Sequence, residues 1–332
     1  MNNSHLISII MPAYNVEPYI EEAIKSVLNQ TILPLELIII NDGSTDGTAD
    51  VIAKYTDNPI VKVITIKNRG LGPARNLGME HAQGEYIYFF DSDDLLAPYF
   101  IAEMNAIIES NNLPDAVFFS AECFEKKPGD LPEHEKNNYL TRKASSQCST
   151  NVELIENLHS HKDFCVCAWS YVSKKEIWIT NKLKFKPIIH EDVPSYYEML
   201  LHINTSTIIQ NTMYYYRMRP NSITNSGVTM KRLYSYKQIA IELLHIRKSC
   251  GSQNLFLFSN VLLEKSTYYM KQYISTSRQL QKKIKYIPLL RSAIKTKNFK
   301  YLYTTIFNLL PLGFQHALKK IKLFLRALNT DK

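Results

Sequence analysis

Apolar residues form short uninterrupted runs in the first third of the chain, and segments with helical periodicity separate these runs. The runs cover residues 6–11, 36–40, 61–66 and 86–90. A run without polar alternation is typical of a strand that is buried on both faces of a sheet. Residues 16–28 instead repeat apolar positions at helical spacing. This alternation of strands and helices predicts βαβ units, an α/β fold and a mostly parallel sheet.

Polar residues follow directly after three of these predicted strands. They are Tyr14 and Asn15 after the first strand, Asp42 after the second, and Asp91, Asp93 and Asp94 after the fourth. Ligands of open α/β sheets bind at this edge. Side chains of Asp91 and Asp93 point the same way, because orientation alternates along a strand. They can therefore converge on one divalent cation that carries phosphate, and Asp94 can approach from the following loop. The alternative is a solvated acidic turn that caps the next helix.

The loop at residues 68–78 bears glycines and leads into a predicted helix. It does not match G-x-G-x-x-G, which disfavours a dinucleotide-binding fold. It also lacks the lysine of a P-loop, so ATP hydrolysis of that type is not expected. A nucleotidyltransferase would need a basic phosphate-binding loop after the first strand, and residues 12–15 offer none.

Composition divides the chain into an acidic body and a basic tail. Residues 1–230 hold 19 Lys and Arg against 28 Asp and Glu, whereas residues 231–332 hold 20 against 3. The start lacks the features of a signal peptide, and the five cysteines lack the spacing of a metal site. We therefore expect reduced thiols and a cytoplasmic protein of 332 residues, with one large domain and an appendage.

The basic tail predicts helices that lie on a membrane surface. Residues 301–318 contain no charged side chain, but Pro311 and Gly313 interrupt them, so they are poorly suited to span a bilayer. An interfacial helical hairpin flanked by lysines suits them better and implies peripheral contact with an anionic membrane. The alternatives are a soluble helical subdomain with a solvated basic face, or a surface for a partner protein. Nucleic-acid binding is not expected, since no recognition module is evident.

Four motifs occur in a characteristic order and spacing. They read Pro-Ala-Tyr-Asn at 12–15, Asn-Asp-Gly-Ser-Thr-Asp at 41–46, Gly-Pro-Ala-Arg-Asn at 72–76 and Asp-Ser-Asp-Asp at 91–94. Together they resemble the inverting family-two glycosyltransferases of GT-A fold, particularly bacterial enzymes that build capsular and other surface polysaccharides. The likeness is strong over residues 6–105, moderate to about residue 225, and weak beyond.

This resemblance implies a UDP-sugar donor and assigns roles at the predicted strand ends. The residue matching Asp42 reads the uracil edge, and the one matching Arg75 lies beside the base. Asp91 would face the uridine, and Asp93 would hold Mg²⁺ or Mn²⁺ on the diphosphate. Asn41 stands where many relatives have Asp, so one neighbouring charge is lost. The nucleotide-sugar site would also include Pro12, Tyr14, Asn15 and Ser92.

The resemblance also implies an acceptor side. Residues 169–177 resemble the segment beneath the transferred sugar, where Trp169 either stacks on a pyranose face or belongs to the core. The pair Glu191-Asp192 resembles a Glu-Asp motif whose Asp is the catalytic base, so Asp192 is the predicted base and Glu191 the alternative. The structural alternative is a pair of acids stabilised at a helix N-terminus.

The last family-like segment is residues 214–224. In relatives a loop with Arg, often His, and Ser closes on the leaving diphosphate, and here Arg217 and Ser222 match. Pro220 stands where His is frequent, so one donor is missing. An arginine at this place would offset the charge that develops on the leaving phosphate. The alternative is an ordinary solvated surface arginine.

These observations predict a GT-A domain over residues 1–228 and a basic helical region over residues 229–332. Residues 1–105 form the predicted nucleotide-binding half, and residues 106–228 form the acceptor half. The predicted function is metal-dependent, inverting transfer of a hexose or N-acetylhexosamine from a UDP-sugar to a glycan or lipid-linked acceptor. The alternative is a catalytically inactive sugar-nucleotide-binding subunit that scaffolds a partner transferase. A processive synthase is disfavoured, since no Gln-x-x-Arg-Trp follows the predicted base. Oligomeric state is left open.

Overall fold

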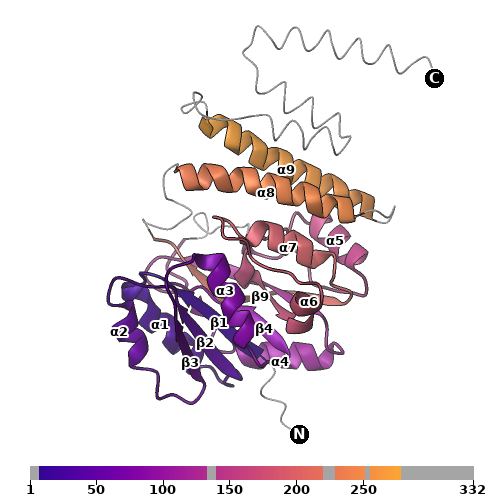
Figure 1. The fold of residues 1–332 in the computed structure, drawn as a ribbon. Helices are drawn as coiled ribbons and strands as arrows, with labels where there is room; N and C mark the ends of the chain where they lie inside the picture. The colour runs from indigo at the N-terminus through magenta and orange to yellow at the C-terminus, as the bar shows by residue number, and fades with distance from the viewer. Residues whose placement is uncertain (1–6, 133–139, 220–228, 251–254, 278–332) are drawn as a thin grey trace, which may run out of the picture. The chain divides into compact units, whose positions relative to one another are not determined.

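A computed structural model of the chain divides into two compact units, residues 1–227 and residues 228–332 (Figure 1). The structure describes residues 7–132, 140–219, 229–250 and 255–277.

The first unit is built on a mixed sheet with nine strands among its described residues. The strands are β1 (Ile7–Ala13), β2 (Glu36–Asn41), β3 (Val61–Thr65), β4 (Tyr86–Phe89), β5 (Leu95–Leu96), β6 (Ala116–Phe124), β7 (Ser146–Cys148), β8 (Tyr171–Lys174) and β9 (Ser206–Arg217). Their order is β3-β2-β1-β4-β8-β6-β9-β5, with β7 paired to β9. Strands β1 to β4 are mutually parallel, whereas β8 is antiparallel to both β4 and β6. Strand β4 therefore joins a parallel half of the sheet to a mixed half.

Seven α-helices accompany the sheet in the described part of this unit. They are α1 (Glu17–Leu28), α2 (Thr48–Ala53), α3 (Leu71–His81), α4 (Phe100–Ser110), α5 (Asn151–Ser160), α6 (Lys175–Thr180) and α7 (Asp192–Leu200). A short 3₁₀ turn, η3 (Ala168–Ser170), precedes β8. Helix α1 begins at the acidic Glu17 with Pro18 in its first positions, which suits a helix N-terminus.

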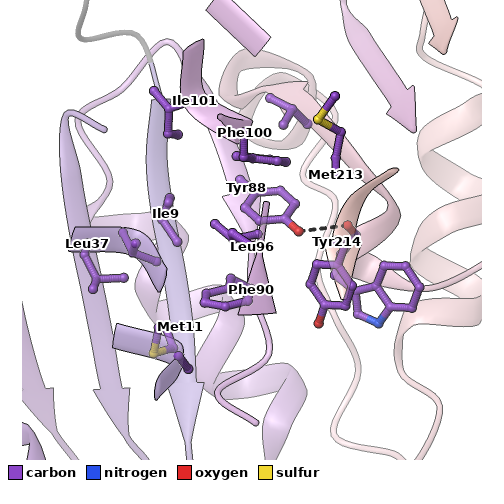
Figure 2. Close-up of a cluster of buried hydrophobic side chains, with 14 of the residues drawn as sticks. Ile9, Met11, Leu37, Tyr88, Phe90, Leu96, Phe100, Ile101, Met213 and Tyr214 are labelled. Atoms are coloured by element: carbon purple, nitrogen blue, oxygen red, sulfur yellow. Dashed lines mark hydrogen bonds between the residues drawn. The ribbon is translucent and has the colours of Figure 1, made fainter. Parts of the chain in front are cut away.

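Alternate residues of the parallel strands supply the two buried faces of the sheet. Ile9 of β1 lies beside Leu37 of β2 and Tyr88 of β4, and these side chains share one hydrophobic core with α1 and α4 (Figure 2). The Tyr88 ring lies 4.6 Å from that of Phe100 in α4. Both faces are buried, so the strands lack the polar alternation of a half-exposed sheet.

The opposite face of the sheet packs against α3 and α6. A Cβ at Gly78 of α3 would collide with Ile10 of β1, so the helix approaches the strand closely only because glycine stands there. Phe89 of β4 packs edge-on against Trp178 of α6 at 5.3 Å and against Phe185 at 4.9 Å. Strand β4 is thus covered on both sides at the point where the chain continues to Asp91.

The α/β fold expected from the sequence is confirmed, and the mixed half of the sheet is the part that the apolar pattern did not specify. Residues Ala116–Phe124 form β6 of this half, which pairs with both β8 and β9. The segment between β6 and α5 contains the three-residue strand β7. Strands β5, β7 and β8 have two to four residues each, which is too short for a recognisable period.

The second unit contains two long helices in its described residues, α8 (Met230–Ser249) and α9 (Phe256–Ser277). Ser266 Oγ donates to the Ala240 carbonyl, and Arg247 Nε donates to the Ser259 carbonyl, so the two helices run antiparallel. Leu233, Ala240 and Leu244 pack with Met270 and Tyr273 in a core of their own. No helix within the described residues has the length and apolarity to cross a membrane. The predicted hairpin at 301–318 lies outside the described residues.

Candidate active site

Arg75 of α3 lies at the centre of the candidate site. Its Nη2 donates to Asp91 Oδ1 at 2.6 Å, and its Nη1 donates to Glu191 Oε1. The guanidinium is buried, with its central carbon 5.4 Å from the centre of the Phe185 ring. Burial alone would lower the pKa of Arg75, but the charges of Asp91 and Glu191 raise it above its ordinary value. Arg75 therefore joins the residues after β4 to the start of α7.

The other residues of the Gly-Pro-Ala-Arg-Asn motif hold the segment that leads toward α7. Asn76 accepts from the Phe185 amide at 2.9 Å and donates to its carbonyl at 2.8 Å. A Cβ at Gly72 would collide with the Lys186 carbonyl, so only glycine permits this approach. The three motif residues therefore act together at this place. Gly72 allows the close approach of the main chain, Arg75 binds the two carboxylates, and Asn76 binds the Phe185 main chain.

Glu191 and Asp192 lie at the N-terminus of α7, and both are influenced by burial. Burial raises the pKa of Glu191, an effect that Arg75 opposes. Burial and the neighbouring charge of Glu191 raise the pKa of Asp192 well above its ordinary value. His190, just before them, has a φ of 60°, a left-handed conformation that turns the chain into the helix. The two predicted candidates for the base therefore differ in their surroundings. Glu191 is bound by Arg75, whereas Asp192 lies next to that ion pair.

Asp94 faces the interior of the domain. Its oxygens accept a hydrogen bond from the Tyr214 hydroxyl and one of 2.7 Å from the Arg217 amide, both in β9. The side chain is buried, which raises the pKa of Asp94 well above its ordinary value. This corrects the expectation that Asp94 approaches a cation from the loop after Asp93. It instead fastens β9 to the end of β4.

Asp93 is paired with an arginine that follows β9. Asp93 Oδ2 lies 2.6 Å from Arg219 Nε, and the Asp93 carbonyl accepts from Arg217 Nε at 2.8 Å. Burial raises the pKa of Asp93, and the charge of Asp91 adds to that effect, whereas Arg219 opposes it. The influence of Asp91 on Asp93 is that expected of two carboxylates at one site.

Asp42 is held by the loop that precedes α3. Its Oδ1 accepts from the Arg69 amide at 2.7 Å, and its Oδ2 accepts from the Gly70 amide at 2.8 Å. Only 3% of the residue is exposed. Gly70 has a φ of 94°, which glycine adopts readily. Asp42 thus positions the loop before Arg75, and its reading of a uracil edge stays a prediction.

Two residues predicted for the nucleotide-sugar site lie at the surface after β1. Tyr14 is 48% exposed, and Asn15 adopts a φ of 52°. Asn15 Oδ1 accepts from the Thr45 amide at 2.8 Å, which joins the first motif to the second. Pro12 is buried in β1, and Ser92 is buried beside Asp91. Their assignment to a donor site also stays a prediction.

Trp169 belongs to the core in this structure. It is 4% exposed, and its ring stacks on Tyr214 with centroids 4.3 Å apart and planes inclined by 4°. Its carbonyl accepts from the Tyr88 hydroxyl at 3.1 Å. These contacts favour the core alternative over stacking on a sugar. The predicted Ser222 lies outside the described residues.

The residues present fit a divalent cation held mainly by substrate. In the described part of the chain, no three or more His, Cys, Asp or Glu side chains are arranged to hold a metal ion. A sugar-nucleotide site does not need such a cluster, because Mg²⁺ typically takes one or two carboxylates and completes its shell with phosphate and water. Asp93, with Asp91 nearby, supplies oxygen donors of this kind.

Three residues that lie in this region were not assigned to the site from the sequence alone. Arg219 pairs with Asp93, Glu22 of α1 accepts from Arg217 Nη2 at 2.5 Å, and the Tyr19 ring lies under both arginines at 5.3 and 5.2 Å. A signal for Arg219 existed: it stands two positions after Arg217 in an extended segment, so its side chain points the same way. Nothing in the local sequence of α1 indicated that Glu22 and Tyr19 lie there.

A cavity of about 490 Å³ lies elsewhere in the unit, against α1 and the edge strand β5. Its described lining includes none of the residues predicted for the site; it consists of Glu22, Lys25, Ser26, Asn29, Leu95, Leu96, Pro98, Pro128 and Tyr215. Glu22 is the link between the two regions, through its bond to Arg217.

Comparison with known proteins identifies the family of this arrangement. Residues 8–152 match the family model described as glycosyl transferase family 2. This chain contains a glycosyltransferase family 2 domain. The matched segment begins in β1 and includes all four motifs around Asp42, Arg75 and Asp91.

Relatives of the family 2 domain extend the match. Over 226 residues, the chain is 33% identical to the uncharacterized glycosyltransferase EpsJ of Bacillus subtilis (strain 168), covering 66% of this chain and 63% of that protein. A shorter segment, 30% of this chain, is 46% identical to 10% of the hyaluronan synthase of Pasteurella multocida. The chain thus matches less than two thirds of the length of these relatives.

Solved structures support the fold. A crystal structure of S. aureus TarS 1-349 in complex with UDP-GlcNAc has a TM-score of 0.62 with 18% identity, covering 96% of this chain and 87% of that chain. The mannosyltransferase PcManGT from Pyrobaculum calidifontis, in complex with GDP-Man and Mn²⁺, has a TM-score of 0.51 with 14% identity, covering 92% and 86%. At these identities the likeness shows the fold alone, and it confirms the expected GT-A architecture of the family 2 domain.

Proposed function

We propose that this protein transfers a hexose or N-acetylhexosamine from a UDP-sugar to a glycan or lipid-linked acceptor, with inversion at the anomeric carbon. The family 2 domain supports glycosyl transfer as the reaction class. The TarS complex with UDP-GlcNAc supports a UDP-sugar as the donor class. Relatives that include a hyaluronan synthase and a chondroitin synthase support polysaccharide synthesis as the context.

The observation that carries this proposal is the bridge made by Arg75. Asp91 comes from the carboxyl end of β4, where the donor is expected, and Glu191 comes from the start of α7, where the base is expected. One buried guanidinium binds both carboxylates, so donor-side and acceptor-side residues meet at one place. Asp192 is adjacent in sequence, and its charge also acts on Arg75.

Asp192 is the carboxylate that we assign as the base. Glu191 is engaged by Arg75, which stabilises its charged form and makes it a weaker proton acceptor. Asp192 has a pKa raised by burial and by Glu191, which strengthens it as a base. It would accept the proton of the acceptor hydroxyl as that oxygen attacks the anomeric carbon. The bond from this carbon to the diphosphate oxygen breaks on the opposite face.

Asp93 is the residue that we assign to the divalent cation, with Asp91 beside it. Bound Mg²⁺ or Mn²⁺ would neutralise charge on the donor diphosphate and its leaving group. The remaining work falls to the chain itself: Arg75 orients Asp91 and Glu191, and Asp42 orients the loop before α3.

A screen for UDP release tests this function. The full chain would be incubated with a panel of UDP-sugars, with Mn²⁺ or Mg²⁺, and with oligosaccharide or lipid-linked acceptors. We expect release with one donor, loss of release in excess chelator, and loss in Asp93→Asn with the fold intact by circular dichroism. UDP binding without turnover for every donor and acceptor would instead favour the non-catalytic subunit. Full activity of Asp93→Asn would contradict the metal assignment.

A further inference from the structure

Arg217, the arginine expected at the leaving diphosphate, is buried and bound to other residues of the domain. Its Nη2 donates to Glu22 at 2.5 Å, its Nε donates to the Asp93 carbonyl at 2.8 Å, and its amide donates to Asp94 at 2.7 Å. The guanidinium carbon lies 4.6 Å from the centre of the Phe124 ring, and the side chain is 8% exposed. Moving the guanidinium to a ligand would break its bonds to Glu22 and to the Asp93 carbonyl and its contact with Phe124, so its place is structural.

Arg219 is held differently, although it follows only two positions later. Its Nε lies 2.6 Å from Oδ2 of Asp93, and both side chains are about one fifth exposed, at 20% and 19%. Its guanidinium carbon lies 5.2 Å from the centre of the Tyr19 ring. Arg219 therefore neutralises the very carboxylate that is assigned to the cation, and it does so at the solvent-accessible edge of the site.

We propose that Arg219 is the counter-ion of Asp93 in the nucleotide-free protein and moves to the donor diphosphate when a divalent cation takes Asp93. This inference rests on the proposed function. A guanidinium and a divalent cation cannot both occupy Oδ2 of Asp93, and their like charges repel at such short distance. The fork of N–H donors of an arginine matches phosphate oxygens, so the displaced Arg219 has a second anion to bind.

The exchange has a direct physical consequence. In the absence of nucleotide, the cation must compete with Arg219 for Asp93, so its binding is weakened. With the donor present, the diphosphate binds both the cation and Arg219. The cation then no longer competes with Arg219, and both favour binding of the nucleotide. Arg219 thus couples binding of the cation to binding of the nucleotide, and Arg217 keeps β9 in place while this happens.

Isothermal titration calorimetry of the full chain with MnCl₂ and no nucleotide tests the exchange. Arg219→Gln removes the competing charge, so we expect Mn²⁺ to bind roughly tenfold more tightly than to the native chain. UDP titrated in saturating Mn²⁺ should bind roughly tenfold more weakly to the same variant, since a charged donor to the diphosphate is lost. Arg219→Lys retains the charge and should lie between the native chain and Arg219→Gln in both titrations.

Two control variants separate this exchange from a general loss of positive charge. Lys25→Gln removes a cation from the exposed face of α1, where Lys25 pairs with Glu21, and should leave both affinities unchanged. Arg217→Gln should lower the melting temperature, because it removes the bonds of the buried guanidinium to Glu22 and to the Asp93 carbonyl. Arg219→Gln should melt close to the native chain.

Unchanged or weaker Mn²⁺ binding in Arg219→Gln overturns the proposal, as does the absence of measurable Mn²⁺ binding in that variant. Failure of the proposed function is distinguishable. In that case no UDP-sugar is turned over, whereas the Mn²⁺ and UDP affinities still move in opposite directions. Turnover of a UDP-sugar with unaltered Mn²⁺ affinity removes only the role of Arg219.

Discussion

Asp42 in the parallel half of the sheet and Asp94 in the mixed half are both buried aspartates that accept one hydrogen bond on each oxygen. The donors to Asp42 are main-chain amides 27 and 28 residues later, in the loop before α3. The donors to Asp94 stand 120 and 123 residues later, in β9. Asp42 therefore shapes a loop within one half, whereas Asp94 joins the two halves. The same kind of hydrogen bonding thus stabilises a nearby loop in the parallel half and a contact between distant parts of the chain in the mixed half.

The candidate site follows the same division. On the parallel side, the predicted donor residues Tyr14 and Asn15 are exposed, and Asn15 is bound to the neighbouring loop through Thr45. On the mixed side, Glu191 and Arg217 are buried and bound to side chains of the first half, Arg75 and Glu22. We expect substitutions on the parallel side to act mainly on ligand binding, and substitutions on the mixed side to act also on catalysis or on the stability of the domain.

The largest effect is expected at Asp192. Asp192→Asn keeps the shape of the side chain but removes its basicity, so the turnover number should fall roughly 10²–10⁴-fold while donor binding survives. Turnover of the UDP-sugar and UDP affinity would be measured side by side.

Glu191→Gln is the matched control for that measurement. It removes the charge that Arg75 binds, so it should lower the melting temperature, and UDP affinity should fall because Arg75 also holds Asp91. If Glu191→Gln instead lost only turnover and Asp192→Asn stayed active, Glu191 would be the base.

A smaller effect is expected at Asp94. In Asp94→Asn, an amide offers one acceptor oxygen to two buried donors, so one donor loses its partner at a cost of about 1–3 kcal/mol. The free energy of unfolding, measured with urea, should fall by that amount.

Asp42→Asn applies the same change on the parallel side. It should cost a comparable amount locally, but it should also weaken UDP binding, whereas Asp94→Asn should leave the UDP affinity of the folded protein unchanged. Loss of UDP binding in folded Asp94→Asn would show that the two halves are not separable in this way.

The pH dependence of kcat/KM should reflect the ionisation of the Asp192 carboxyl group. A base must be deprotonated to act, and burial together with Glu191 raises the pKa of Asp192. The value of kcat/KM should therefore rise with pH, about tenfold per unit on the acidic limb, and level off above the pKa of this group. In Asp192→Asn that limb should vanish from the residual activity. Its persistence would assign the titration to another carboxyl.

The smallest effect concerns the second unit. Its predicted basic tail should bind anionic vesicles, because basic residues near such a surface contribute about 1 kcal/mol each and salt screens that attraction. Co-sedimentation should show binding to anionic vesicles, partial release in high salt, and loss on truncation after residue 295.

UDP binding by the truncated protein should be retained, since the candidate site lies in the first unit. Equal binding to neutral and anionic vesicles would exclude the electrostatic part. No binding at all would favour a helical subdomain with a solvated basic face.

Local features of the sequence were sufficient to predict the strands and the first helix of the parallel half. The buried runs of β1 to β4 and the periodicity of α1 depend on neighbouring residues alone, so they could be predicted to within a few positions. The expectation that Asp91 and Asp93 point the same way by strand alternation does not apply, because β4 ends at Phe89 and both residues lie in the turn that follows it. The motif at residues 72–76 was also evident, although the function of each of its side chains was not.

Only the tertiary structure decided which charges meet. Arg75 and Glu191 are 116 residues apart, and Arg219 lies far along the chain from Asp93, so no local pattern encodes either pair. The burial of Trp169 on Tyr214 likewise depends on the pairing of distant strands. Ion pairs and ring stacking act through space over a few ångströms, whereas periodicity records only the immediate neighbours along the chain. The partners of the site residues were therefore determined by the fold.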